Sequence, residues 1–314
     1  MGSPNGLWTA VSGGMAQSQN LDIIANNLAN TNTAGFKKDS PTFKEFLTAV
    51  ERPPSPDIDI PRTAFKDSDF YHFDGREHAM VNLDKITTDH TQGSFKNTNA
   101  PFDMAIDGAG FFAVQTPNGL MYTRSGDFKV NGEGQLVNQE GYPVLALSGD
   151  AAEAASPANQ QPPQQPAAPE AARNPASLNP FTAPYPAPDG GKALLKPISL
   201  KDAIQTGHKI HVSPEGEIYA DDEQIAKLAV AEFADPRLLK KENTTLYSNP
   251  DAANVPRIDG GSRVRQGFLE QSNVNPVSEL VNLLKANRLF ESNMRAIKAY
   301  NDMAGKEANE VGKL

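Results

Sequence analysis

The possible folds of this chain are limited above all by a long amphipathic segment at its C-terminal end. A second amphipathic segment lies at its N-terminal end. In the C-terminal segment, large apolar residues recur every seven positions at Leu283, Phe290 and Ile297, and a second series follows at Leu280, Asn287 and Met294. Heptads sustained over several repeats predict a long helix with a coiled-coil seam. Asn275 is the expected N-cap, and Pro276 is the expected first helical residue.

The N-terminal segment has a weaker pattern of the same kind. A helix is expected to begin near Asn5 and to end in the Asn-rich run before Gly35. Two interleaved heptad series run along it: Leu7, Gly14, Leu21 and Leu28, and then Val11, Ser18 and Ala25. Because this seam is narrow and partly small or polar, the helix is expected to need partners on several sides.

The interior of the chain has strand character instead. Short apolar runs between 85 and 149, and again between 191 and 250, are separated by Asn-Gly and Asp-Gly pairs that are typical of hairpins. Asp107-Gly108 is read as one such hairpin turn, since the strand-to-helix context of a dinucleotide-binding loop is missing. The sequence therefore predicts an α+β fold, in which N- and C-terminal α-helices form a coiled-coil-like layer and a central all-β domain is inserted between them.

The expected domain boundaries follow these changes of pattern. Residues 1–36 and 275–314 form the helical region, 37–84 an extended connecting arm broken by prolines, and 251–274 a return connector. The β-rich domain comprises 85–149 and 191–250. Residues 150–190 interrupt it with a Pro/Ala/Gln-rich composition that cannot bury enough apolar surface to fold, so a flexible insertion is expected there.

Composition excludes several classes of function. A net charge of -9 argues against a nucleic-acid partner, and the absence of cysteine excludes disulfides and thiolate chemistry. No apolar run is long enough to span a membrane, and no secretory signal pattern is present at the N-terminus. We expect no catalytic residues, no cofactor and no metal: His208 and His211 should point to opposite faces of a strand, and Asp221-Asp222-Glu223 reads as a solvated turn.

Several long motifs, which occur in order along the chain, resemble those of bacterial flagellar rod and hook proteins. At the N-terminus these are residues 7–15, 24–30 and 35–38, which read LWTAVSGGM, IANNLAN and GFKK. The centre contributes QGSF at 92–95, DMAIDGAGFF at 103–112 and YTRSGDF at 122–128. Residues 266–277, QGFLEQSNVNPV, resemble the start of the family's C-terminal helix.

The resemblance implies a non-enzymatic axial subunit of the flagellar basal body. Its terminal helices would pack as an inner layer around an export channel, and the subunit would leave the cytosol through the flagellar type III export apparatus without a cleavable signal peptide. Partners would be rod subunits of the same and related types, proximal and distal, and the ring bushing around the rod. The run at 89–95 favours the proximal-rod type over the distal-rod type.

On this reading, apolar and Asn side chains of the two helices form the assembly interface: Leu7, Trp8, Val11, Leu21, Asn26, Asn27, Leu28, Leu280, Leu283, Asn287, Phe290, Met294 and Ile297. Two other classes stay open. One is a secreted β-domain binding module that oligomerises through its helices. The other is a periplasmic wall hydrolase, which would need paired carboxylates or a metal site that the sequence does not offer.

Overall fold

The computed structural model describes residues 5–48, 78–148, 185–186, 192–258 and 261–311. The chain divides into two compact units. The helical unit contains the N-terminal helix, residues 39–87 and everything from 275 onward, and the β unit contains residues 30–38 and 88–274. Most of the predicted arm and of the predicted insertion lies outside the described residues.

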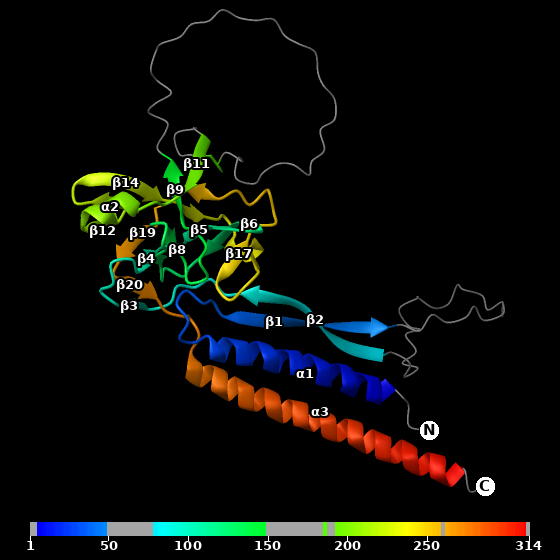
Figure 1. The fold of residues 1–314 in the computed structure, drawn as a ribbon. Helices are drawn as coiled ribbons and strands as arrows, with labels where there is room; N and C mark the ends of the chain where they lie inside the picture. Colours follow the sequence, from blue (N-terminus) through cyan, green and yellow to red (C-terminus); the bar gives the residue numbers. More distant parts are fainter. Residues whose placement is uncertain (1–4, 49–77, 149–184, 187–191, 259–260, 312–314) are drawn as a thin grey trace, which may run out of the picture. The chain divides into compact units, whose positions relative to one another are not determined.

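The helical unit is formed by α1 (Asn5–Ala29) and α3 (Pro276–Val311), with strands β1 (Asp39–Thr48) and β2 (His78–Thr88). The two helices lie side by side and run in opposite directions (Figure 1). β1 and β2 form a two-stranded sheet. The described ends of the predicted extended arm are therefore paired strands, and residues 78–84 of that arm belong to β2.

Side chains of α1 hold this two-stranded sheet. The Asn27 amide donates to the Asp39 carbonyl over 2.8 Å and accepts from the Asp39 backbone N–H over 3.0 Å. Further along, the Val81 backbone N–H donates to the Ser12 hydroxyl at 3.3 Å. Polar side chains of α1 thus satisfy one backbone carbonyl and two backbone N–H groups of this sheet.

The start of α3 agrees with its prediction. The Asn275 side-chain oxygen accepts from the backbone N–H groups of Val277 at 3.0 Å and Ser278 at 3.2 Å, and Pro276 is the first helical residue. This cap satisfies two of the backbone donors that have no partner within the helix.

The β unit is built on two six-stranded sheets. The first has the order β10-β11-β9-β14-β13-β12 and the second β16-β17-β6-β5-β15-β18. The strands of the first are β9 (Leu145–Ser148), β10 (Tyr185–Pro186), β11 (Lys192–Pro197), β12 (Ile210–Val212), β13 (Glu217–Ala220) and β14 (Glu223–Leu228). Those of the second are β5 (Phe111–Thr116), β6 (Gly119–Thr123), β15 (Val230–Glu232), β16 (Lys240–Lys241), β17 (Leu246–Ser248) and β18 (Arg257–Ile258). A short helix, α2 (Lys201–Thr206), follows β11.

Three small antiparallel pairs complete the unit. They are β3 (Phe95–Asn97) with β20 (Phe268–Glu270), β4 (Met104–Asp107) with β19 (Arg263–Gln266), and β7 (Lys129–Val130) with β8 (Leu136–Val137). Two of the three pairs join residues near 100 to residues near 265. The C-terminal part of the unit is therefore paired directly with its beginning.

One apolar run is divided between the two sheets, and one local prediction was wrong. In the run from 225 to 233, the chain passes at Ala229 from β14 in the first sheet to β15 in the second. Asp107-Gly108 is not the hairpin turn that was predicted. β4 pairs with β19 and β5 pairs with β6, so this dipeptide connects two different sheets. Local turn chemistry does not specify which strand the next one will pair with.

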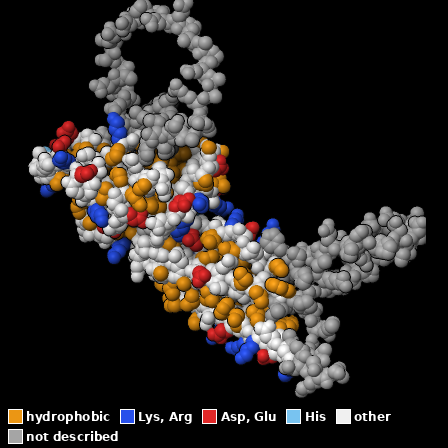
Figure 2. Space-filling model, turned by 45° about the vertical axis from the view of Figure 1, so that its right-hand side comes forward, with side chains coloured by type: hydrophobic (Ala, Val, Ile, Leu, Met, Phe, Trp, Pro, Cys, Tyr) orange, Lys and Arg blue, Asp and Glu red, His pale blue; other side chains and the backbone are white. Residues whose placement is uncertain are grey.

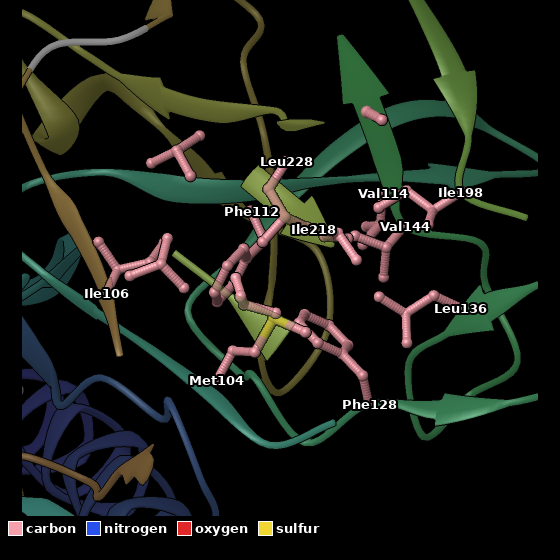
Figure 3. Packing of buried hydrophobic residues seen from close by; sticks show 14 of the residues in the cluster. Met104, Ile106, Phe112, Val114, Phe128, Leu136, Val144, Ile198, Ile218 and Leu228 are labelled. Carbon is pink, nitrogen blue, oxygen red and sulfur yellow. The ribbon is translucent and has the colours of Figure 1, made fainter. Parts of the chain in front are cut away.

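The core of the β unit lies on both faces of β5. Phe112 and Val114 pack into one apolar cluster with Met104, Phe128 and Leu136 (Figure 3). The alternate residues Phe111 and Ala113 belong to a second cluster, with Phe233 and Tyr247 among others. Because successive side chains of a strand point to opposite faces, a continuous apolar run such as 111–114 marks a strand that is buried on both sides.

Candidate assembly interface

The residues that face each other between α1 and α3 include small ones. A Cβ atom added to Gly13 would lie 3.6 Å from the Asn293 side chain, and one added to Gly14 would lie 4.0 Å from Asn293 and Ile297. On α3, Ala286 is buried. Small residues let two helix backbones approach closely, and Gly14 is one of the small positions in the seam that the heptad pattern predicted.

The predicted interface residues of α3 divide between two sides of the helix. Leu283, Phe290 and Ile297 are partly buried, whereas Leu280, Asn287 and Met294 are exposed. On the side of α3 that faces α1, a second series consists of Ala286 and Asn293. Each lies one residue before a member of the predicted second series, Asn287 and Met294. Both series have the same period, so the sequence pattern alone does not separate them.

The predicted residues of α1 are also divided. Val11, Leu21 and Leu28 are partly buried, Trp8 and Asn26 are exposed, and Asn27 is buried by its contacts with Asp39. Intramolecular packing therefore does not cover Trp8, one of the residues assigned to the assembly interface. The side chain of Leu7 lies outside the described residues.

Large apolar side chains that remain exposed are concentrated on the two helices. Figure 2 shows hydrophobic side chains gathered over the surface that the helices form. The residues concerned are Trp8, Met15, Val277, Leu280, Val281, Leu284, Leu289, Met294, Tyr300 and Met303. Contiguous apolar surface of this kind usually marks a binding surface.

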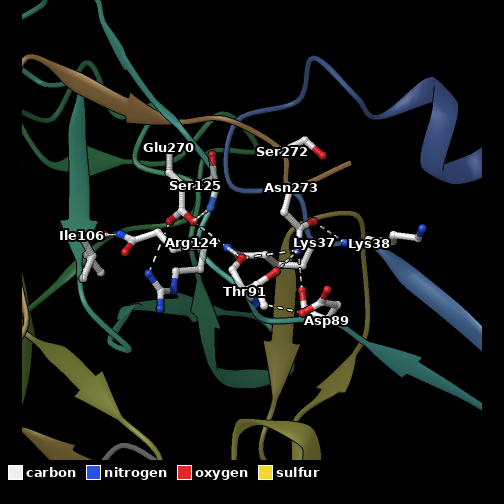
Figure 4. Close-up of polar contacts among 12 residues, drawn as sticks. Lys37, Lys38, Asp89, Thr91, Ile106, Arg124, Ser125, Glu270, Ser272 and Asn273 are labelled. Atoms are coloured by element: carbon white, nitrogen blue, oxygen red, sulfur yellow. Dashed lines mark hydrogen bonds and ion pairs between the residues drawn. The ribbon is translucent and has the colours of Figure 1, made fainter. Parts of the chain in front are cut away.

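Sequence reasoning missed a buried ionic cluster in the β unit, here called the ionic junction: Lys37, Arg124 and Glu270. The Lys37 ammonium lies 2.5 Å from one oxygen of the Glu270 carboxylate, and the Arg124 guanidinium lies 3.4 Å from the other. The Lys37 and Glu270 side chains have no exposed surface. Figure 4 shows the three side chains converging from different segments of the chain.

Further hydrogen bonds complete the ionic junction. Lys37 also donates to the Thr91 carbonyl at 2.7 Å, the Gly93 N–H donates to Glu270 at 2.9 Å, and Arg124 donates to the Gly108 carbonyl at 2.7 Å. Burial lowers the pKa of Lys37 and of Arg124 below their ordinary values, and the Glu270 carboxylate opposes that shift in both cases. A paired and hydrogen-bonded arrangement is what makes buried charge tolerable.

The backbone around the ionic junction is packed equally closely. Gly35 donates to the Glu270 carbonyl at 2.8 Å and has a φ of 69°. A side chain at Gly35 would collide with the backbone of Arg124 and Ser125. Asn273 accepts from the Lys38 N–H and donates to the Asp89 carbonyl, each over 2.8 Å. The segments that lead from α1 and into α3 are thus bonded to each other inside the β unit.

His208 and Asp221, for which no metal or catalytic role was predicted, form a local contact at a turn. Asp221 contacts His208 at the turn between β13 and β14. The hydrogen bond from His208, with a second from the Lys209 N–H, lowers the pKa of Asp221. Over the described ranges, no group of three or more acidic or His side chains is arranged to hold a metal ion, and no helix is long and apolar enough to cross a bilayer.

Comparisons with known proteins agree with the positions of these features. Three family models match: "Flagella basal body rod protein" over residues 7–37, "Flagellar hook protein FlgE/F/G D1 domain" over 105–220, and "Flagellar basal body rod FlgEFG protein C-terminal" over 265–311. The first and third contain α1 and α3, and they also contain Lys37 and Glu270 of the ionic junction. The second lies wholly within the β unit.

Curated relatives match over almost their full lengths. A flagellar basal-body rod protein FlgG from Borreliella burgdorferi is 28% identical, with 95% of this chain and 96% of the relative covered. FlgG from Buchnera aphidicola subsp. Baizongia pistaciae is 29% identical, over 96% and 97%. FlgF from Caulobacter vibrioides is 28% identical, over 99% of both chains. The chain belongs to the flagellar basal-body rod protein family. The similarity is about equal for FlgG and FlgF, so it does not separate the two types.

Proposed function

We propose that the chain is a structural subunit of the flagellar basal-body rod and that it polymerises through α1 and α3. The observation that carries this proposal is the set of apolar side chains that the paired helices leave exposed, Trp8, Met15, Leu280 and Leu284 among them. Complete burial of a large apolar side chain contributes about 1.5–3 kcal/mol, and these side chains, which are about half exposed, would contribute part of that when a neighbouring subunit covers them.

The assembled form would be a hollow shaft that crosses the periplasm, transmits torque and conducts exported subunits. Proximal and distal rod proteins would be its neighbours, the ring bushing would surround it, and the flagellar type III export apparatus would deliver it. The run at 89–95 favours a proximal, FlgF-like position, with a distal, FlgG-like position as the alternative. No catalytic step, cofactor or metal enters this proposal.

A substitution on the exposed side of α3 tests the proposal. Leu284→Asp places a charge on an apolar, exposed position, so the monomer should lose less than about 0.5 kcal/mol of its free energy of unfolding. Rod assembly and motility should be lost when the variant replaces the wild-type chain in cells. The matched control is Asn282→Asp, which adds the same charge two residues away at an exposed position on the other side of the helix.

The control should assemble normally and swim. Normal rods in the Leu284→Asp strain would contradict polymerisation through this surface. Loss of assembly in both strains would mean that any added charge on α3 blocks export or folding, and the proposal would lose its support.

A further inference from the structure

Six of the exposed apolar residues of the two helices form two faces of similar length. The outer face of α1 consists of Trp8 and Met15, one heptad apart, whose side chains are 53% and 64% exposed. The α3 stripe consists of Val277, Leu280, Val281 and Leu284, which are 69%, 47%, 45% and 58% exposed. Their spacing of three, four and seven places them on one side of the helix, and seven residues of α-helix span about 10.5 Å.

Each of these faces points away from the intramolecular contact. At 100° per residue, the α3 stripe is centred about 150° around the helix from Leu283, Ala286 and Asn293. The outer face of α1 is rotated by a similar angle, about 150°, from the side on which Gly13 and Gly14 approach α3. Helices whose two contact faces are nearly opposite can alternate α1, α3, α1, α3 in a curved layer, in which every second contact joins two copies.

The positions of charged residues favour one register for the contact between α1 of one copy and α3 of the next. All copies in a polar tube point the same way, so α1 of one copy and α3 of the next are antiparallel, as they are within one chain. If the two copies were level, as in the intramolecular pair where Gly13 faces Asn293, then Trp8 would face Lys298 and Met15 would face Glu291. That register would bury charges against apolar side chains, which is unfavourable.

Sliding one copy by 14 residues removes the conflict. Trp8 then faces Leu284 and Met15 faces Val277, and no charged residue lies on either exposed face within the contact. The nearest charges on the two faces, Asp22 of α1 and Arg288 of α3, fall beyond its two ends. Fourteen residues of α-helix correspond to an axial displacement of about 21 Å.

We infer that the outer face of α1 packs against the α3 stripe of a second copy of this chain, antiparallel and displaced by about 21 Å along the helix axis. The inference rests on the proposed function and adds to it the partner, the two surfaces and the register.

Cysteine cross-linking tests the register directly, because the chain has no cysteine of its own. Two double variants report the displaced register: Trp8→Cys with Leu284→Cys, and Met15→Cys with Val277→Cys. The comparison variant, Trp8→Cys with Lys298→Cys, reports the level register. A disulfide needs Cα atoms within about 7 Å, and within one chain the Met15 and Val277 positions are offset by about 14 residues, so a bond there must join two copies.

Each variant replaces the wild-type chain in cells, rods are isolated after mild oxidation, and the products are separated by size without reductant. We expect a ladder of dimers, trimers and higher species for the two displaced pairs, which reductant removes, and monomer for the level pair. Each single-cysteine variant should stay monomeric.

The possible failures are distinguishable. If the cysteine-free parent does not enter rods at all, the proposed function fails first and the inference fails with it. If the parent enters rods but only the level pair gives a ladder, the displacement is overturned. If no pair cross-links in assembled rods, or if the product has the mass of a different subunit, the contact with a second copy is overturned.

Discussion

The β unit and the helical unit differ in how completely they bury their apolar side chains. In the β unit, both faces of β5 are covered, and Phe111, Phe112 and Val114 have no exposed surface. In the described part of the helical unit, the buried apolar side chains are Ala16, Ile24 and Ala286, two of which are alanine. The β unit completes its own core, whereas the helices leave apolar surface that other molecules can cover.

The ionic junction extends this contrast. It lies in the β unit, yet two of its three members come from the short segments next to the helices, Lys37 after α1 and Glu270 before α3. The stability of the β unit therefore includes the segments from which the helices emerge.

The largest effect on the β unit, relative to the helical unit, is expected when the charge at the centre of the ionic junction is removed. Glu270→Gln keeps the shape of the side chain but leaves Lys37 and Arg124 buried without a counter-ion. We expect the β unit to lose about 3–5 kcal/mol of its free energy of unfolding, measured by urea denaturation.

The control is Glu291→Gln on α3, whose carboxylate forms only an exposed pair with Arg295 and should change stability by less than about 0.5 kcal/mol. Equal, small effects of the two substitutions would mean that the ionic junction does not stabilise the β unit.

A backbone change at the same place should have a smaller effect. Gly35→Ala forces a side chain onto a residue with a φ of 69° and into the backbone of Arg124 and Ser125, so we expect a loss of about 2 kcal/mol or more. Gly132→Ala serves as control, since its φ is not positive and nothing lies within 4 Å of the added atom. Thermal unfolding of both variants measures the difference, and a Gly35→Ala protein as stable as the control would refute the close approach.

The smallest effect should be confined to the helical unit. Asn275→Ala removes the side-chain cap from the first turn of α3 and should cost about 1 kcal/mol locally. Peptide-level hydrogen exchange should show faster exchange in 276–284 and unchanged exchange in 111–123. Asn282→Ala, an exposed position inside the same helix, should not accelerate exchange. Faster exchange in the β unit of the Asn275→Ala protein would mean that the two units do not respond independently.

An element of the fold was predictable where a short stretch of sequence is enough to specify it. The cap at Asn275 and Pro276, the beginning of α1 and most strands of the β unit follow from local patterns, and the structure agrees with them. The family was predictable because its motifs are long and ordered. The same motifs contain Lys37, Arg124 and Glu270, but nothing in their spacing indicated that the three would meet.

Amphipathic helices at both ends and strands between them follow from the sequence alone, because period and turn chemistry are local properties. The tertiary structure settled which side of each helix is covered, since a heptad pattern fits equally well one residue away. It also decided that Asp107-Gly108 connects two sheets and that Lys37 pairs with Glu270, 233 residues away. Pairings over such distances depend on how the whole chain returns on itself, which no local pattern encodes.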